Sequence, residues 1–290
     1  MHPAPSVIAF TTLSGLGFGL LFWLGLGFPP VTGWVAFTFF ALAYLLAVGG
    51  LLASTFHLGH PERAFKAFTQ WRSSWLSREA WCSLAALLVM AAFGVGLVFA
   101  ATALVPLGWL GAVLSIGTVL TTSMIYTQLR TVPRWHQPLT PVLFLSFALA
   151  GGSLLAGMVH LAPWLLAAAG IVQLAHWYLG DSALARSGTD LATATGLGAP
   201  GRIRAFEPPH TGPNYLTREL VFVIGRKHAR KLRVIALVLL SVLPILLLLL
   251  PFHHVLAALA VLSHLAGAAC SRWLFFAEAE HVVGLYYGKR

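Results

Sequence analysis

The chain has 290 residues, of which 58% are hydrophobic and 9% are charged, and its formal net charge at pH 7 is +10. So low a charged fraction excludes an ordinary soluble domain, in which about a quarter of the residues are charged. The positive excess fits a solvated face or lipid headgroups, and it does not indicate a nucleic-acid partner in a chain this apolar.

Eight apolar runs follow one another along the chain, and each is about as long as a helix that crosses a hydrocarbon core. Runs such as 234–251 are continuous and leucine-rich, whereas a transmembrane barrel needs alternating residues. The sequence therefore predicts an all-α integral membrane protein with eight transmembrane helices in a lipid bilayer. The runs lie at residues 5–27, 34–56, 80–103, 107–128, 138–158, 161–180, 234–251 and 254–276, and His264 and Arg272 interrupt the last one.

The lysines and arginines are concentrated in three connectors, at 57–79, 128–137 and 181–233, while the connectors near 30, 105, 160 and 252 carry none. With eight helices, the three basic connectors and both termini share one face of the membrane. The positive-inside rule makes that face cytoplasmic. A protein partner that docks on the basic face is a competing reason for the charge bias.

The two longest basic connectors end in similar tetrapeptides, Leu76–Glu79 (LSRE) and Leu216–Glu219 (LTRE). This echo suggests two four-helix halves, about 1–128 and 138–290, within a single polytopic domain. The connector 181–233 in the second half is long, basic and rich in glycine and proline, which is typical of irregular structure.

A structural role explains both glutamates of these tetrapeptides. Ser77 or Thr217 can cap a helix with its hydroxyl, and a glutamate in the first turn is then favoured by the helix dipole. The residues that follow separate the two glutamates. A basic run, 226–231, follows Glu219 closely, whereas an uncharged run of about 24 residues follows Glu79. Glu79 is thus predicted at the mouth of a membrane helix, where an ionisable group is a functional candidate.

His57 lies at the end of the second apolar run and Glu79 precedes the third, so the connector between them can bring both side chains to one membrane interface. Oxidation of a hydroquinone releases two protons with its two electrons, and imidazole and carboxylate are suitable acceptors near neutral pH. Arg63 and Arg78 can steady Glu79 as an anion or hydrogen-bond a quinone oxygen. On position alone, a hydrogen bond of His57 in an interfacial aromatic belt explains that residue equally well.

Other polar residues give weaker signals. Cys82 and Cys270 lie in or beside apolar runs without CxxC spacing, so no disulfide, iron–sulfur or covalent haem site is indicated, and we expect no metal on this chain. Arg130 and Arg134 follow the fourth run. They can line a quinone cavity or contact a partner, although anchoring to lipid headgroups is the commoner role of such residues.

Several longer motifs, taken together, resemble a known family. Over the whole chain they are similar to the membrane-anchor subunits of bacterial dimethyl-sulfoxide-reductase-type molybdoenzymes. The motifs are HLGHPERA at 57–64, WLSREAW at 75–81, YTQLRTVPRWHQPLTP at 126–141, YLTRE at 215–219, RKHARK at 226–231 and RWLFFAEAEHVVGLYYG at 272–288.

This resemblance implies an eight-helix, haem-free anchor in the bacterial inner membrane. Such an anchor oxidises menaquinol and passes the electrons to a ferredoxin-like iron–sulfur subunit, which feeds a molybdopterin catalytic subunit. In the family, the histidine of the HLG motif and the glutamate of the S-x-E motif are associated with quinol oxidation, and here they fall on His57 and Glu79. The resemblance leaves the terminal substrate open. Exported catalytic partners, which are frequent in this group, would place the basic face outside.

Two other functions compete with this interpretation. A small-solute transporter places ionisable or unwound elements near the bilayer midplane, whereas the basic and acidic residues here gather at one rim. A haem b quinol oxidase subunit needs opposed histidine pairs on facing helices. His57, His160, His176 and His264 are available for that role, but the first three are expected near helix ends.

Overall fold

The computed structural model describes residues 1–56, 58–198, 201, 203–204, 206–207, 212, 214–221 and 224–287. These residues form helices and connecting segments and contain no strand. The long helices are α1 (Pro5–Gly25), α2 (Gly33–Thr55), α3 (Trp75–Phe99), α4 (Val105–Thr127), α5 (Leu139–Leu155), α6 (Ala162–Asp181) and α11 (His254–Ala277). The shorter ones are η1 (Pro61–Phe68), α7 (Ala183–Arg186), α8 (Leu191–Thr195), η2 (Leu216–Leu220), η3 (Ile224–His228), α9 (Ala229–Leu237), η4 (Val238–Val242), α10 (Leu243–Leu249) and η5 (Val282–Tyr287).

The all-helical prediction is confirmed over the described residues, and each predicted apolar run falls on helical structure. Six helices are long and apolar enough to cross a membrane, namely α1, α2, α3, α4, the segment Arg226–Leu249 and α11. Helix α5 has only 17 residues, and α6 carries the polar residues Gln173 and His176 in its second half. Multiple membrane passes are therefore supported, while the number eight stays a prediction.

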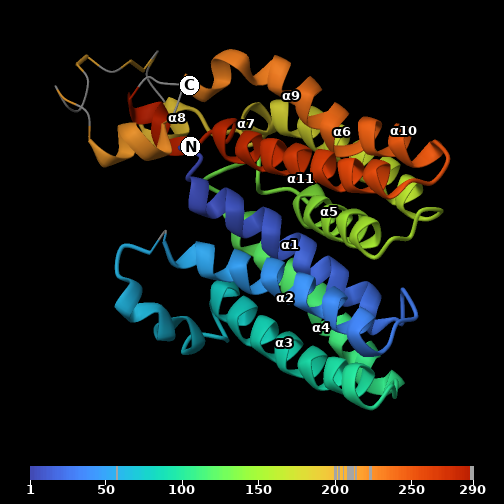
Figure 1. Ribbon diagram of the computed structural model, residues 1–290. Coiled ribbons are helices and arrows are strands. Elements are labelled where there is room, and N and C mark those ends of the chain that lie inside the picture. Colours follow the sequence, from blue (N-terminus) through green and yellow to red (C-terminus); the bar gives the residue numbers. More distant parts are fainter. Residues whose placement is uncertain are drawn as a thin grey trace.

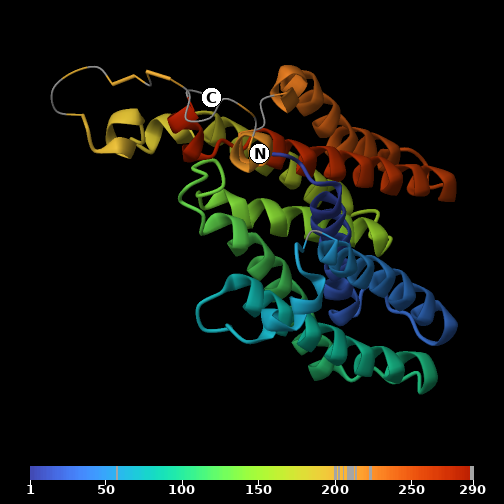
Figure 2. The same ribbon diagram turned by 90° about the vertical axis from the view of Figure 1, so that its left-hand side faces the viewer.

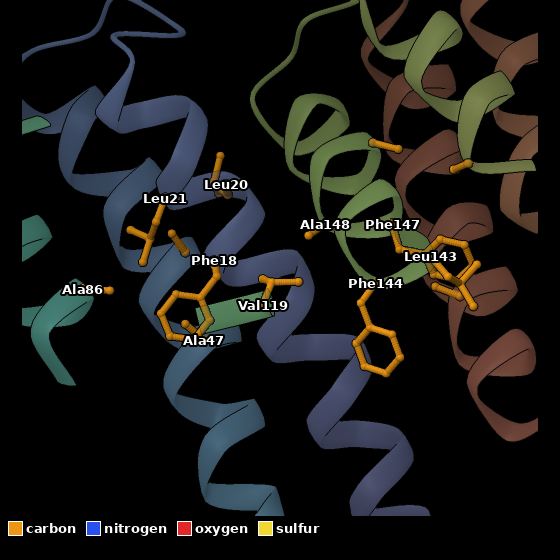
Figure 3. Packing of buried hydrophobic residues seen from close by; sticks show 14 of the residues in the cluster. Phe18, Leu20, Leu21, Ala47, Ala86, Val119, Leu143, Phe144, Phe147 and Ala148 are labelled. Carbon is orange, nitrogen blue, oxygen red and sulfur yellow. The ribbon is translucent and has the colours of Figure 1, made fainter. Parts of the chain in front are cut away.

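Helix α1 lies at the centre of the bundle, in contact with α2, α4, α5 and α11 (Figure 1). It is the most buried of the six apolar helices. Phe18 and Leu21 lie on the side of α1 that faces Ala47 of α2, and Ala148 of α5 lies on the other side (Figure 3). Because lipid tails are as apolar as leucine, helices in a membrane associate through close packing more than through burial of apolar surface.

Small residues allow this close packing between α1 and α5. A Cβ atom added to Gly19 would overlap the carbonyl oxygen of Ala148, and one added to Gly152 would overlap the backbone of Gly19. The obstacles are backbone atoms, which cannot rotate out of the way. Glycine at these positions therefore sets the distance between α1 and α5.

Replacement of Gly19 by alanine is expected to push α1 away from α5 and to lower the free energy of unfolding by about 2 kcal/mol, the usual cost of overpacking a core. Thermal unfolding of the detergent-solubilised protein, followed by loss of the monodisperse chromatographic peak, measures this effect. Gly49→Ala is the matched control, because a Cβ at Gly49 meets nothing within 4 Å. Equal thermal midpoints for the two variants would contradict the packing argument.

The basic connectors gather at one end of the bundle, which we call the basic end. Figure 1 shows the connector after α2, the connector after α4, the connector after α6 and the amino terminus on the same side, and Figure 2 shows the connector after α6 projecting there. Element η5, the last described element, also lies there. The described parts of the three basic connectors thus lie at one end of the bundle with the amino terminus, as predicted, whereas residues 288–290 lie outside the described structure. That this end faces one side of a membrane stays a prediction.

The seventh apolar run is interrupted at Pro244, where the π-helix η4 leads into α10. Proline has no backbone N–H, so carbonyl groups one turn earlier lose their helical donor. Helix α11 supplies two replacements. Ser263 Oγ donates to the carbonyl of Leu239 (2.9 Å), and His264 Nδ1 donates to the carbonyl of Leu240 (2.7 Å). This pairing fixes the rotation of α11, and it leaves Nε2 of His264 as a hydrogen-bond acceptor.

Candidate functional site

Glu79 is a buried carboxyl near the start of α3, and only 4% of its surface is exposed. The helix begins at Trp75 with Ser74 at its N-cap position, and no side chain caps it. Glu79 therefore lies beyond the first turn, on the face of α3 that packs against α4. A carboxyl group buried in an apolar bundle carries a large desolvation cost when it is charged, so it needs a specific hydrogen-bonding partner.

The partner of Glu79 is Thr122 of α4, whose hydroxyl donates a hydrogen bond to Oε1. The same hydroxyl oxygen lies 2.9 Å from the carbonyl oxygen of Thr118. A hydroxyl has one proton and can also accept. Thr122 can thus donate to an ionised Glu79, or accept from a protonated Glu79 while it donates to Thr118. The pair accommodates both charge states of the carboxyl without any change in the backbone.

His57 lies outside the described residues, so its position relative to Glu79 stays a prediction. Arg63 is exposed, and its Nε lies 3.9 Å from Glu62. Arg130 is also exposed and lines an open cavity at the basic end together with Arg186. Neither of these arginines contacts Glu79 within the described structure.

Arg78 turns away from Glu79 and toward the connector that precedes α3. Its Nε donates to the carbonyl of Trp71 (3.0 Å) and its Nη2 to the carbonyl of Arg72 (2.7 Å). Its guanidinium carbon lies 4.3 Å from the ring centroid of Trp75. In this structure Arg78 therefore orders the start of α3 and does not pair with Glu79.

The two hydroxyl residues considered as helix caps have different roles in the structure. Ser77 is buried inside α3, and its hydroxyl accepts from the backbone N–H of Gln70 (3.2 Å). In the other tetrapeptide Asn214 and Thr217 bond reciprocally: Asn214 Oδ1 accepts from the N–H of Thr217, and Thr217 Oγ1 accepts from the N–H of Asn214 (2.9 Å each). Glu219 is exposed whereas Glu79 is buried. The two similar tetrapeptides thus have different surroundings, as the residues that follow them predicted.

A second cluster of charged residues joins four segments at the basic end. Arg233 donates to Asp181 (2.8 and 2.5 Å) and to Glu278 (2.7 Å). Arg134 donates to Asp181 (2.7 Å) and lies 3.6 Å from Glu278. Of the three roles considered for Arg134, headgroup anchoring does not fit the structure, because the side chain is buried against carboxylates. The cluster ties the end of α6 to α9 and to the residue after α11.

A cavity lies between α1, α4, α5 and α11, and it is lined by Thr122, the partner of Glu79. Among the other polar side chains that line it are Arg272, His264 and Thr12. Each has buried atoms without a hydrogen-bond partner: Nε and Nη1 of Arg272, Nε2 of His264 and Oγ1 of Thr12. The cavity has about 20 Å³ of room, which is enough for about one water molecule. In the sequence, Arg272 stood out only as an interruption of an apolar run, and His264 as an interruption and as one of four histidines considered for haem.

The other histidines considered as ligands have separate surroundings. His176 of α6 is buried, and its Nε2 lies 3.3 Å from Thr140 Oγ1. His160 lines a cavity at the end of the bundle opposite the basic end, together with His253. Over the described ranges, no group of three or more His, Cys, Asp or Glu side chains is placed to hold a metal ion.

Comparison with known proteins gives matches that extend over almost the whole chain. The family model described as "DMSO reductase anchor subunit (DmsC)" matches residues 6–288. A sulfite dehydrogenase subunit from Allochromatium vinosum is 33% identical over 326 residues, which cover 99% of this chain and 99% of that protein. No solved structure matches the chain.

Proposed function

Because the chain belongs to the DMSO reductase anchor subunit family, and is thus a membrane anchor subunit of a molybdoenzyme complex, we propose that it oxidises a membrane quinol. The resemblance inferred from the sequence motifs is confirmed by these matches. In the proposal, electrons pass from menaquinol to a ferredoxin-like iron–sulfur subunit and then to a molybdopterin catalytic subunit. The terminal substrate is bound by that catalytic subunit and not by this chain.

The observation that carries the proposal is the buried contact between Glu79 and Thr122. Quinol oxidation releases two protons at the site where the electrons leave, so a proton acceptor must lie beside the substrate. Glu79 can accept a proton without losing its hydrogen bond, because the hydroxyl of Thr122 can donate or accept. A carboxyl that served only to begin a helix would gain nothing from burial, since the dipole acts on exposed side chains as well.

Purification of the intact assembly is the first test. The chain is tagged and extracted from native membranes in a mild detergent, the co-purifying proteins are identified by mass spectrometry, and a visible absorption spectrum is recorded. We expect an iron–sulfur protein and a molybdopterin protein, with no haem b band. A lone polypeptide in several mild detergents would favour a transporter, and a Soret band would favour a haem protein.

The opposite direction of electron flow is the second candidate function. It is favoured by the relative that is 33% identical over 99% of this chain, which belongs to a sulfite dehydrogenase. A dehydrogenase removes electrons from its substrate, so an anchor of that kind would deliver them to a quinone, and Glu79 would then supply protons. The purified complex is assayed both ways, with naphthoquinol as donor and with naphthoquinone as acceptor, and the faster direction decides.

The sidedness of the complex is also a proposal. The basic end carries three connectors rich in lysine and arginine, and we place it on the cytoplasmic side of the bacterial inner membrane. A cysteine introduced at exposed Arg130 tests this placement with a membrane-impermeant maleimide. Labelling in intact spheroplasts would show that the basic end faces outward, and labelling only after lysis would support the cytoplasmic placement.

Replacement of His57 by alanine is expected to slow quinol-dependent turnover at least tenfold, because a general base typically contributes that much or more. The prediction rests on the HLG motif, since the residue lies outside the described structure. Turnover driven by a soluble reductant of the partner proteins should stay unchanged. Quinol-dependent turnover equal to that of the unmodified complex would remove His57 from the site.

Replacement of Thr122 by valine is expected to slow quinol-dependent turnover by about tenfold, because valine has the same shape but cannot donate to Glu79 or accept from it. Loss of one hydrogen bond to a charged group corresponds to about 1.5–3 kcal/mol. Thr122→Ser retains the hydroxyl and should retain most of the activity. Equal quinol-dependent turnover in Thr122→Val and Thr122→Ser would contradict a role of Thr122 in proton transfer.

A further inference from the structure

Arg272 differs from three other buried or half-buried arginines in the part of the chain that the structure describes. Arg134, Arg226 and Arg233 each pair with a carboxylate, whereas Arg272 forms no ion pair within the described residues. Its surface is 2% exposed, and its Nε and Nη1 have no hydrogen-bond partner. An unpaired cation in an apolar interior is strongly disfavoured, so such groups in membrane proteins usually mark a binding site.

Aromatic rings hold Arg272 in place without satisfying its N–H groups. The guanidinium carbon lies 3.5 Å from the ring centroid of Phe144 and 5.0 Å from that of Phe147. Cation–π contacts of this kind fix the plane of the guanidinium. The N–H of Nε and the N–H groups of Nη1 point away from different edges of that plane, so each nitrogen can donate to a separate oxygen acceptor.

The cavity beside Arg272 is connected to the proton acceptor of the proposed function. Thr122 lines the cavity and donates to Glu79. The room in the cavity suits one oxygen atom, supplied either by water or by a ligand. A ligand oxygen that replaces a water and keeps its hydrogen bonds loses no affinity. The remaining lining is largely apolar, as expected for a site that receives a hydrophobic ring.

The cavity has an opening beside Gly15 of α1. A Cβ atom added to Gly15 would meet nothing within 4 Å, although Gly15 lines the cavity. Ala268 of α11, another small residue, also lines the cavity. The open space beside Gly15 is therefore the side on which a flat ring has room to approach the cavity.

We propose that this cavity binds the ring oxygen of the quinol or quinone, with an unpartnered N–H of Arg272, at Nε or at Nη1, as the donor and the ring lying toward Gly15. The inference rests on the proposed function, and it places the substrate on the side of Thr122 that faces α1 and α11. Arg272 is then a substrate-binding residue, and Thr122 connects the bound oxygen to Glu79.

Equilibrium binding of radiolabelled 2,3-dimethyl-1,4-naphthoquinone to the purified native complex tests this assignment. Arg272→Met removes the donors, and Gly15→Leu fills the opening without removing any polar group. We expect each substitution to weaken binding at least tenfold. Gly49→Leu is the matched steric control, because Gly49 of α2 is also unobstructed but does not line the cavity. It should bind within twofold of the unmodified complex. Arg272→Lys restores one donor and should give intermediate affinity.

The outcomes separate the two proposals. If the unmodified complex binds no naphthoquinone, the proposed function fails, and the assignment of the cavity fails with it. If the unmodified complex binds but Arg272→Met and Gly15→Leu bind equally well, the proposed function stands and the assignment is overturned. If Arg272→Met does not assemble, the comparison of Gly15→Leu with Gly49→Leu decides alone: equal affinities overturn the assignment, and a tenfold difference supports it.

Discussion

Replacement of Glu79 by glutamine is expected to lower quinol-dependent turnover at least a hundredfold while the complex stays assembled. Glutamine has the volume of glutamate, and its carbonyl oxygen can still accept the hydrogen bond from Thr122. The substitution therefore preserves packing and removes only the capacity to bind a proton. General acid–base catalysis typically contributes a factor of about 10² to 10⁴, which sets the expected loss.

Two assays on the same preparation measure this effect. Turnover with a short-tailed naphthoquinol requires the anchor, whereas electrons from a reduced viologen dye enter at the partner proteins. We expect the first activity to collapse and the second to stay unchanged. If both fall together, Glu79 is needed for assembly and not for the proton.

Glu219 provides the matched control, because it ends a similar tetrapeptide but its side chain is exposed at the surface. Glu219→Gln should leave quinol-dependent turnover within about twofold of the unmodified complex, as surface substitutions usually have small effects. A loss as severe as that of Glu79→Gln would mean that burial does not distinguish the two glutamates. Full activity of Glu79→Gln would remove Glu79 from the proposed mechanism.

The helices were predictable because a long apolar run has few alternatives in a membrane. The detailed structure of each helix was harder to predict, and the seventh apolar run illustrates this. Pro244 is visible in the sequence as a helix breaker. The sequence does not show that Ser263 and His264 bond to the carbonyl groups that this proline leaves free. These two hydrogen bonds depend on which face of α11 packs against η4. The rotation of one helix relative to another is set by side-chain packing and cannot be read from the length of an apolar run.

The candidate site was also predictable only in part: the sequence indicated Glu79 but not its partner. The uncharged run after Glu79 marked it as a membrane residue, and its burial is in accord with that. Its partner Thr122 lies 43 residues away with no local signal, because threonines are common in membrane helices and most bond to their own backbone. Arg272 appeared only as an interruption, since its lack of a carboxylate partner among the described residues is a property of the folded bundle.

Arg134 shows why charged residues at a membrane rim are the hardest to interpret. A headgroup anchor and a buried ion pair have the same sequence signal, an arginine just beyond an apolar run. The difference lies in Asp181 and Glu278, which come from elsewhere in the chain. Only the fold brings these two carboxylates and Arg134 together with Arg233.

Replacement of Arg233 by methionine is accordingly expected to destabilise the protein by about 3 kcal/mol, the low end of the cost of breaking a buried ion pair. Methionine keeps the apolar stem, but Glu278, which is 6% exposed, loses its closest cation. The penalty is at the low end because Asp181 is half exposed and Arg134 remains near both acids.

Thermal unfolding of the purified complex should then show a midpoint lower by roughly 5 °C or more. Arg230→Met is the control, since Arg230 lies on the same helix with its side chain exposed. Equal thermal midpoints for Arg233→Met and Arg230→Met would mean that solvent screens the charges of the cluster. Quinol-dependent turnover measured below the lowered midpoint should be normal for Arg233→Met. The cluster joins α6, α9 and the end of α11 and does not include Glu79. We therefore expect Arg233→Met to lower stability without a defect in proton transfer, whereas Glu79→Gln should have the opposite effect.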